Sequence, residues 1–386
     1  MATTVITGVQ YSGIWSLAGQ ANAVALGTWP VQPMPKLYSW GSNNSGQLGL
    51  GNTTNYSSPK QIGALTTWGE TSGGGFHSIV TKTDGTLWAW GRNSAGQLGL
   101  GNTTYYSSPK QVGALTSWLR VAGGYLFSLA IKTDGTLWGW GTNTTGQLGL
   151  SNTTNYSSPK QVGALTNWSK VAGGETFCLA ITTGGTLYSW GSNINGQLGL
   201  GNITSYSSPK QIGALTNWST VSGGERHSLA TKTNGTLWAW GFNGSGQLGL
   251  GNLTSYSSPM QVGALTTWLT IAAGYRHSLA VKTDGTLWVW GLNSSGQLGQ
   301  GNTTNYSSPK QIGAFTTWNS TFGGYGHTVA TKTDGTLWSW GLNTSGQLGI
   351  GSSSNVSSPN QVGALTTWAT LTPRCYGYFT LAIATT

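Results

Sequence analysis

One block of fifty residues is written seven times in this chain, and that period restricts the fold more than any other feature. When the chain is aligned on its Trp-Gly pairs, each pair is followed by a variable residue, Asn, two more residues and Gly-Gln-Leu-Gly. The tryptophans of these pairs are Trp40, Trp90, Trp140, Trp190, Trp240, Trp290 and Trp340. Because repeated units pack mainly on their neighbours, a chain of 386 residues can form one continuous array.

Each block has the pattern of short antiparallel strands. The segment "HSIVTKTDGTLWAWG" contains two alternating stretches around Asp84-Gly85, a pair typical of a two-residue type I′ hairpin. Trp88 and Trp90 lie two positions apart, so both point to the same side of their strand. With 62 Gly, 21 Trp and only 6% charged residues, the composition fits a packed all-β protein. We predict three to four strands per block, forming one blade.

The two ends of the repeat region complement each other. "LYSWG" (37–41) has no hairpin partner before it, and "YFTLAIATT" (378–386) stops before a Trp-Gly strand of its own. Pairing these segments would complete a seventh blade and remove exposed sheet edges. We therefore predict an all-β, seven-bladed β-propeller over residues 37–386, closed by pairing of its N- and C-terminal strands and preceded by a leader, residues 1–36.

The consensus "VAGGxxHSLAIKTDGTLWAWGxNxxGQLG" resembles the regulator-of-chromosome-condensation repeat, whose members form seven-bladed β-propellers. The family includes nucleotide-exchange factors for a small GTPase, chromatin binders and secreted β-lactamase inhibitors, so the resemblance implies a fold and not one function. Exchange activity is a poor match, because the exchange factors insert a wedge-like excursion and use acidic residues. Every block here has the same length, and acidic residues are scarce.

The leader contains "YSGIWSLAGQANAVALGTWP" (11–30), which resembles a short segment that precedes such propellers in phage virion proteins. Either the leader packs on the propeller as an extra strand or plug, or it docks the propeller on a larger assembly. The second interpretation makes candidate attachment residues of Tyr11, Ile14, Trp15 and Trp29. The leader lacks the charged start of a signal peptide, and we expect no membrane insertion.

Few residues in the sequence are suited to catalysis. Four of the seven carboxylates occupy predicted turns, where Asp serves the backbone, and these are Asp84, Asp134, Asp284 and Asp334. Only three glutamates remain. Glu175 and Glu225 occupy equivalent positions in adjacent blocks, with no third group expected to orient them. We therefore expect no catalytic residues, no cofactor and no enzymatic activity.

The four histidines occupy one position of the block and are His77, His227, His277 and His327. Around a closed ring, such a set could converge on a metal ion. The same position holds Phe127, Phe177 and Phe379, however, which favours a packing role and no metal site. Cys178 and Cys375 fall at different points of the block, so we expect free thiols.

The net charge of +10 indicates either an anionic partner or a few lysines multiplied by copying. No run of basic residues occurs, and no aromatic residues alternate with the lysines as single-stranded nucleic acid binding requires, so we do not expect nucleic acid as a partner. One set of lysines precedes the turn aspartates, which offset its charge: Lys82, Lys132, Lys232, Lys282 and Lys332. A second set follows Ser-Ser-Pro and is expected to serve solubility: Lys60, Lys110, Lys160, Lys210 and Lys310.

Two positions vary while most others are fixed: the residue after Trp-Gly and the residue before His or Phe. Positions without a fold constraint are where a propeller can carry a recognition surface, although unselected drift produces the same variation. The candidate recognition residues are Phe76, Arg92, Leu126, Arg226, Phe242, Arg276, Leu292 and Leu342. Among them, three neighbouring blocks carry an apolar residue after Trp-Gly, which predicts an adhesive sector.

These observations predict a non-enzymatic binding or structural propeller, specifically a phage virion protein of the tail, fibre or capsid surface. Its leader would contact other virion or assembly proteins, and its loops would face a host surface protein or glycan. The alternative is a soluble bacterial protein-interaction or inhibitor propeller, in the cytoplasm or outside the cell.

Overall fold

The computed structural model describes residues 34–369 and 377–385, and within these the chain is all β. The predicted attachment residues Tyr11, Ile14, Trp15 and Trp29, and also Cys375, lie outside the described residues. The first strand begins at Pro35, two residues before the predicted start of the repeats. In the described part of the chain, no helix is long and apolar enough to cross a membrane.

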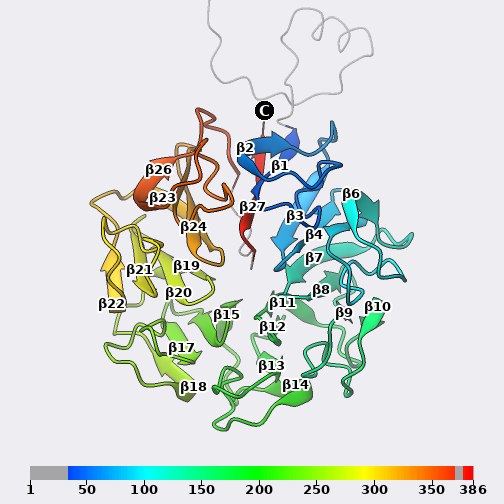
Figure 1. The fold of residues 1–386 in the computed structure, drawn as a ribbon. Helices are drawn as coiled ribbons and strands as arrows, with labels where there is room; N and C mark the ends of the chain where they lie inside the picture. The colour runs from blue at the N-terminus through cyan, green and yellow to red at the C-terminus, as the bar shows by residue number, and fades with distance from the viewer. Residues whose placement is uncertain (1–33, 370–376, 386) are drawn as a thin grey trace, which may run out of the picture. The chain divides into compact units, whose positions relative to one another are not determined.

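The strands form seven antiparallel sheets, the blades of a propeller, arranged around a central axis (Figure 1). Blade 1 contains β1 (Pro35–Gly41), β2 (Tyr56–Gln61) and β27 (Phe379–Thr385). Blade 2 contains β3 (Trp68–Gly73), β4 (His77–Lys82), β5 (Leu87–Gly91) and β6 (Tyr106–Gln111). Blade 3 contains β7 (Trp118–Gly123), β8 (Phe127–Lys132), β9 (Leu137–Gly141) and β10 (Tyr156–Gln161). Blade 4 contains β11 (Trp168–Gly173), β12 (Phe177–Thr182), β13 (Leu187–Gly191) and β14 (Tyr206–Gln211).

The remaining blades repeat this order. Blade 5 contains β15 (Trp218–Gly223), β16 (His227–Lys232), β17 (Leu237–Gly241) and β18 (Tyr256–Gln261). Blade 6 contains β19 (Trp268–Ala273), β20 (His277–Lys282), β21 (Leu287–Gly291) and β22 (Tyr306–Gln311). Blade 7 contains β23 (Trp318–Gly323), β24 (His327–Lys332), β25 (Leu337–Gly341) and β26 (Val356–Gln361). In each, the first strand is innermost, because the first strands of neighbouring blades contact one another.

The predicted closure of the ring is confirmed. Strand β1 pairs antiparallel with β27 over its whole length, from Pro35 opposite Thr385 to Gly41 opposite Phe379. The same blade joins the two ends of the described propeller in Figure 1, where β27 lies beside β1. The β1–β27 pairing must break before blade 1 or blade 7 can separate from the ring. The unfolding of these two blades is therefore coupled.

The predicted type I′ hairpin is wrong in its turn type. A type I′ turn needs positive φ at both central residues, but here only Gly85 has it (φ 77°). The main-chain N–H of Gly85 donates to the carbonyl of Lys82, and the N–H of Lys82 donates to the carbonyl of Thr86 (both 2.9 Å). The Asp84 carboxylate accepts bonds from the N–H and hydroxyl of Thr86. Asp84 therefore stabilises a three-residue loop by its side chain and does not need a left-handed backbone.

Three aromatic residues per blade pack together in the core; they are three tryptophans in five blades, and two tryptophans with Tyr38 in blade 1 or Tyr188 in blade 4. Trp68 at the start of the innermost strand packs edge-to-face on Trp88 and Trp90, with ring centroids 6.4 and 6.1 Å apart. Trp90 is completely buried, and the same arrangement recurs in the other blades. Edge-to-face pairs contribute about 0.5–1.5 kcal/mol beyond the area they bury.

A main-chain carbonyl from each Gly-Gln-Leu-Gly loop joins its blade to the next. The carbonyl oxygen of Gln97 accepts the indole N–H of Trp140 at 2.9 Å and the hydroxyl of Ser128 at 2.8 Å, both from the following blade. Across the closure, the carbonyl of Gln347 likewise accepts bonds from Trp40 and Thr380. The carbonyls of Gln47, Gln147, Gln197, Gln247 and Gln297 make the corresponding pairs of bonds.

Gly349 tests how closely the ring is packed at its closure. A Cβ at Gly349 (φ 71°) would lie 2.6 Å from Nε1 of Trp40, whereas a Cβ at Gly363 (φ 61°) would have no atom within 4 Å. Both Gly→Ala changes carry the left-handed backbone penalty of about 1–2 kcal/mol. Gly349→Ala should destabilise by about 1–3 kcal/mol more, because the indole must move. Urea unfolding of the two variants measures this difference, and equal stabilities would contradict a tight closure.

Candidate functional site

The two variable positions of the repeat meet at one end of the blades, which we call the tip rim. It consists of the hairpin tips between the first and second strands of each blade and the residue after each Trp-Gly pair. In every blade a backbone hydrogen bond of 2.8–2.9 Å joins the two positions. The bonded pairs are Ser42–Tyr378, Arg92–Phe76, Thr142–Leu126, Ser192–Thr176, Phe242–Arg226, Leu292–Arg276 and Leu342–Gly326.

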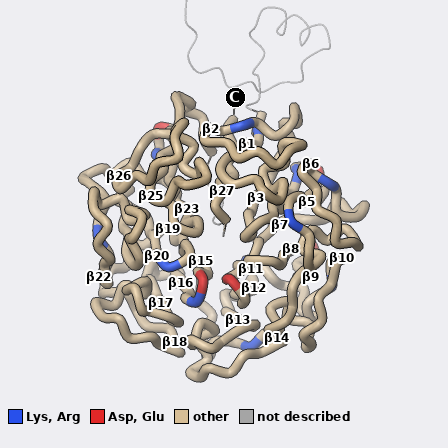
Figure 2. Tube along the Cα trace, in the orientation of Figure 1, with Lys and Arg blue, Asp and Glu red and all other residues tan. Residues whose placement is uncertain are grey.

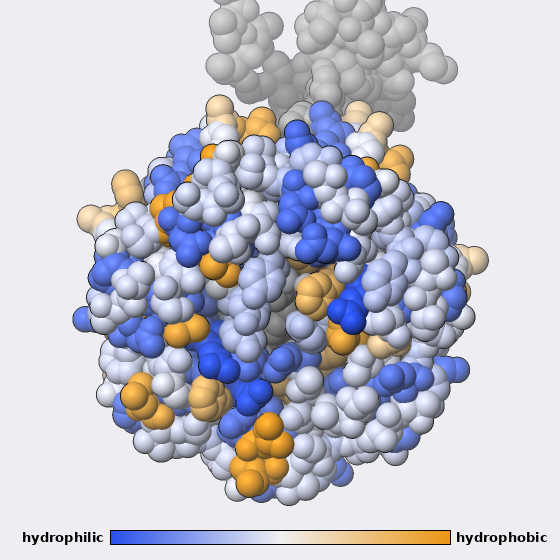
Figure 3. Space-filling view, viewed as in Figure 1, coloured by the Kyte–Doolittle hydropathy of each residue, from blue (hydrophilic) through white to orange (hydrophobic). Residues whose placement is uncertain are grey.

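All eight predicted recognition residues therefore lie on the tip rim, and all are partly exposed. The Arg92 guanidinium lies over the Phe76 ring, with Cζ 5.4 Å from the ring centroid. The Arg276 guanidinium lies over Phe242 at 5.6 Å. In Figure 3, hydrophobic and hydrophilic patches alternate around the central opening of the propeller. Whether these residues recognise a partner remains a prediction; their grouping on one rim is a finding.

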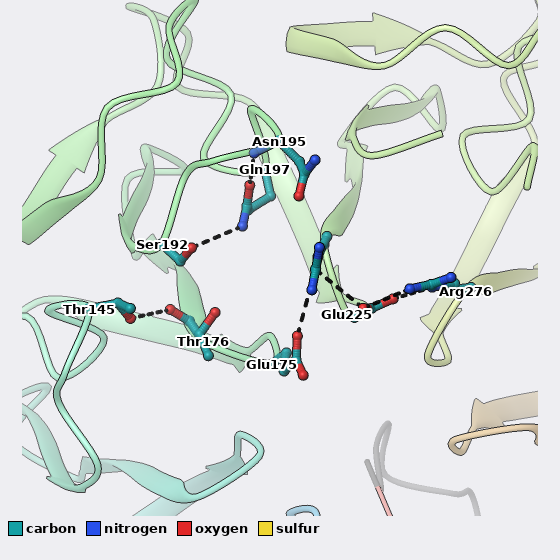
Figure 4. Close-up of polar contacts among 9 residues, drawn as sticks. Thr145, Glu175, Thr176, Ser192, Asn195, Gln197, Glu225 and Arg276 are labelled. Carbon is teal, nitrogen blue, oxygen red and sulfur yellow. Dashed lines mark hydrogen bonds and ion pairs between the residues drawn. The ribbon is translucent and has the colours of Figure 1, made fainter. Parts of the chain in front are cut away.

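Two glutamates and two arginines form a charged cluster on blades 4 to 6 (Figures 2 and 4). The side chain of Glu225 is only 1% exposed and accepts a two-pronged contact from Arg276, including Nη2 to Oε1 at 3.0 Å. Arg226 Nε lies 3.2 Å from Glu225 and 4.0 Å from Glu175. The expectation that no third group orients these glutamates is therefore wrong, because each arginine projects from a hairpin tip next to a glutamate.

The cluster is electrostatically balanced and held in place. Burial raises the pKa of Glu175, and the nearby Glu225 charge raises it further, while the arginines oppose this. Hydrogen bonding to Glu225 raises the pKa of Arg276, so this guanidinium stays charged. The side chains of the two arginines are the most exposed of the cluster, at 41% for Arg226 and 33% for Arg276. Both carboxylates are thus paired with arginine at the tips of the blades.

Three tyrosines stack along the next part of the tip rim. Tyr275 and Tyr325 have ring centroids 4.2 Å apart, and Tyr325 and Tyr378 are 4.4 Å apart, each pair tilted by 27°. Burial, together with neighbouring groups, raises the pKa of Tyr275 and Tyr378. The sequence analysis missed this feature. Its signal was a tyrosine at the position before the variable column in two successive blocks, Tyr275 and Tyr325, whereas Tyr378 stands in the variable column itself.

A loop on the rim also ties neighbouring blades together. The hydroxyl of Thr145, from the loop after β9, donates to the carbonyl of Thr176 at the tip of blade 4 (3.1 Å; Figure 4). The tip residues Tyr125 and Glu175 of adjacent blades are joined by a backbone hydrogen bond of 3.3 Å. The tips therefore form a connected surface and not separate loops.

A second ion pair lies toward the other end of the innermost strands. Arg120 Nη1 on β7 is 3.7 Å from Glu70 Oε2 on β3. Burial raises the pKa of Glu70 to about 7, although the Arg120 charge opposes this rise. Lys170 on β11 donates to the carbonyl of Ser219 at 2.5 Å. The third glutamate therefore pairs with an arginine outside the cluster of Glu175 and Glu225.

The four histidines are buried packing residues that join blades. His77 is fully buried, and its Nε2 lies 2.8 Å from the hydroxyl of Ser128 in the next blade. Because that hydroxyl donates to the Gln97 carbonyl, it must accept from His77, which assigns the neutral Nε2–H tautomer. His227, His277 and His327 make the same contact. Among the described residues, no group of three or more His, Cys, Asp or Glu is placed to hold a metal ion.

The lysines before the turns have a partner that the sequence analysis missed. Lys82 Nζ lies 3.7 Å from the ring centroid of Trp88 and 5.2 Å from that of Trp68. Cation–π contacts of this kind stabilise by about 0.5–2 kcal/mol. The Lys82 ammonium group therefore interacts both with the Asp84 carboxylate and with the two indole rings.

Comparison with known proteins agrees with this geometry. The family model described as "Regulator of chromosome condensation (RCC1) repeat" matches residues 36–81, 84–131, 134–181, 184–231, 234–281, 284–331 and 334–382. A second model of the same description matches 119–147, 168–197, 218–247, 269–297 and 320–347. No curated protein matches the chain in sequence.

Solved structures share the fold at low sequence identity. Human WBSCR16 is 22% identical, with a TM-score of 0.81 over 91% of this chain and 99% of its own. Prp20p of Saccharomyces cerevisiae, described with its binding properties to Gsp1p and histones, is 22% identical with a TM-score of 0.81 over 92% of each chain. Yeast RCC1 (Prp20) bound to Kap60 is 20% identical, with a TM-score of 0.81 over 100% of this chain and 96% of its own.

The buried histidines predict a loss of stability in mild acid. Burial lowers the pKa of His227 to about 3, so the folded protein does not take up a proton there, whereas the unfolded chain does so below about 6.5. The stability from this residue is complete above pH 6.5 and falls as pH decreases, by about 2 kcal/mol at pH 5. His227→Phe copies Phe177 of the preceding blade. Its free energy of unfolding, measured in urea, should fall by about 2 kcal/mol less between pH 7 and pH 5 than that of the parent chain.

The reverse change gives the matched control for this prediction. Phe177→His places another imidazole opposite Ser228 and should steepen the loss of stability in acid. If both variants showed the pH dependence of the parent chain, these buried imidazoles would not be the groups that titrate.

Proposed function

Because the chain belongs to the family of regulator of chromosome condensation repeat proteins, we propose that it binds a protein partner through its tip rim. Propellers of this family are binding or regulatory proteins, and the solved relatives described with partners bind proteins. The rim is supported as the docking surface by one observation: it brings together two of the positions at which otherwise near-identical blades differ. A surface that differs from blade to blade can select one partner in one orientation.

The chemistry of the tip rim fits a protein partner. Arg226 and Arg276 are held by the buried Glu225, so part of their conformational entropy is already lost before binding. Arginine and tyrosine are enriched among residues that dominate protein interfaces. The stacked Tyr275, Tyr325 and Tyr378 lie on neighbouring tips. Pre-ordered aromatic and guanidinium groups favour binding to a protein surface.

Paired variants test which end of the propeller binds. Phe242→Ser removes an aromatic ring from the rim, and Phe315→Ser removes one that is 55% exposed in the loop after β22. A partner recovered from native extracts with the parent chain should bind Phe242→Ser at least about tenfold more weakly, which corresponds to about 1.4 kcal/mol. Phe315→Ser should bind it normally. The opposite ranking would place docking elsewhere.

We further propose the virion assignment as the finer form of this function. Its support is the leader's resemblance to segments of phage virion proteins, together with the near-identity of the copies, which suggests recent duplication. The virion location, the attachment role of Tyr11, Ile14, Trp15 and Trp29, and a host surface protein or glycan as target all remain proposals. The soluble bacterial interaction or inhibitor propeller remains the alternative.

Deleting residues 1–33 separates these two proposals. If the leader attaches the propeller to a particle, the shortened chain should fold, with the thermal unfolding of the parent, and be absent from purified particles. The parent chain expressed alongside it should be incorporated. Incorporation of the shortened chain would contradict the attachment role, and a parent chain that forms one stable soluble complex without any particle would favour the alternative.

A further inference from the structure

Two adjacent blades expose apolar side chains where the other blades carry Thr or Ser. Ile203 in the loop after β13 is 66% exposed, and Leu253 in the loop after β17 is 62% exposed. The equivalent residues of the other blades are Thr53, Thr103, Thr153, Thr303 and Ser353. A single exposed leucine is ordinary, but neighbouring exceptions to a copied hydroxyl residue set blades 4 and 5 apart as an interaction surface.

The loops that carry these residues are held in place on the face of the tip rim. Asn193 Nδ2 donates to the carbonyls of Asn202 at 3.0 Å and Thr204 at 2.9 Å, the two neighbours of Ile203. The equivalent asparagine of blade 5 makes the same two bonds, both of 3.0 Å. Because each asparagine directly follows a rim residue, the apolar side chains project from a fixed backbone beside the rim.

The aromatic ring of Phe242 is held in the same region. A Cβ at Gly244 would lie 2.5 Å from Cζ of Phe242, so the ring lies against the glycine backbone. The equivalent residue in blade 4 is Ile194, which is 62% exposed. The Arg276 guanidinium lies over the Phe242 ring, 5.6 Å from its centroid. A ring fixed between loop and guanidinium loses little conformational entropy on binding.

Together these residues form a surface that we call the apolar sector: Ile194, Ile203, Phe242 and Leu253. Figure 3 shows hydrophobic patches over blades 4 and 5, at the lower part of the view, near the hydrophilic residues around the central opening. The charged cluster of the tip rim belongs to blades 4 to 6. The apolar sector and the cluster therefore occupy the same side of the propeller.

The charge presented beside the apolar sector is positive. On the tip rim, Arg92, Arg226 and Arg276 outnumber Glu175 and Glu225. The side chain of Glu225 is 1% exposed, whereas that of Arg226 is 41% exposed. The Arg226 Nε lies near both glutamates, and neither of its Nη groups has a hydrogen-bond partner among the described residues. An approaching carboxylate therefore meets a guanidinium group with free donors.

This combination selects among possible occupants. A second copy of the chain, placed face to face, would oppose the same arginines and bring like charges together. An uncharged apolar partner would cover the apolar sector but would also desolvate Arg226 without pairing it, which costs binding energy. A protein segment that carries both apolar and acidic side chains satisfies both parts of the surface.

Starting from the proposed function, on which this inference rests, we propose that the partner docks on blades 4 to 6 through an acidic, apolar segment. Its apolar side chains cover the apolar sector, and one Asp or Glu carboxylate accepts hydrogen bonds from the Nη groups of Arg226. The buried Glu225 serves as the support that keeps the arginines in position. Blades 1 to 3 then contribute little to the affinity.

Selection from a displayed library of random linear peptides on the full chain tests this chemistry. Peptides that combine apolar residues with Asp or Glu should be enriched. They should bind the double variant Ile203→Thr/Leu253→Thr at least about tenfold more weakly. This variant copies the Thr of other blades, so its loops keep their fold. The control Leu215→Thr removes a 50% exposed leucine from the loop after β14, at the other end of the blades, and should bind normally.

A single arginine variant tests the charge. Arg226→Thr copies Thr176 and leaves Arg276 on Glu225. It should weaken the selected peptides by about threefold and reduce the effect of added salt on their binding. An unchanged salt effect would overturn the pairing of a partner carboxylate with Arg226.

The remaining outcomes separate this inference from the proposed function. Enriched peptides without carboxylates, or no enriched peptides, would overturn the acidic partner, and equal binding of the double variant would overturn the position on blades 4 to 6. Binding that is lost only in Phe76→Ser would keep the rim as the docking surface and reject the apolar sector. Binding that survives every one of these variants would reject both.

Discussion

The propeller depends on one contact that is repeated at every blade interface, the acceptance of two hydrogen bonds by the main-chain carbonyl of a glutamine. The acceptor belongs to one blade, and both donors belong to the next. Its position depends on a loop that is fixed by its own side chains. In blade 2, Asn93 Oδ1 accepts the N–H of Leu98, and Gln97 Oε1 accepts the N–H of Ala95 (both 2.9 Å). The invariance of Asn-x-x-Gly-Gln-Leu-Gly follows, because the side chains hold the loop and the loop presents the carbonyl.

The fold could be predicted from the sequence because the same fifty-residue block occurs seven times. The blade count and the pairing of β1 with β27 follow from a strict period with an incomplete unit at each end. The turn type could not be read from Asp84-Gly85, because the same dipeptide suits a loop in which the Asp side chain replaces the backbone requirement. The dipeptide Asp-Gly shows that positive φ is allowed at these residues, but it does not show whether one or both of them adopt it.

The tip rim was predictable only in part, because its contacts join residues that are far apart in the sequence. Variation at two positions predicted its members, and strand ends predicted that they share a surface. The contact of Arg276 with Glu225 joins residues 51 positions apart in adjacent blades, and nothing local in the sequence shows that one reaches the other. The same holds for Lys82 and Trp68, whose contact depends on how two strands of one blade place their side chains. The repeats show which residues occupy equivalent positions in different blades. Contacts between different positions of the block can be found only from the packed structure.

The architecture separates two kinds of surface by the way they tolerate change. Residues that bind the glutamine carbonyl or fill the space between blades are under the same constraint in every blade, so the interfaces between blades remain alike wherever duplication copies them. The tip residues contribute backbone hydrogen bonds to the rim whatever their side chains are, so Arg92, Phe242 and Leu342 can occupy one position. A rim that differs from blade to blade favours a single partner. Because the pairing of β1 with β27 closes the ring, the seven interfaces and the rim residues are present in fixed number and fixed order on each molecule.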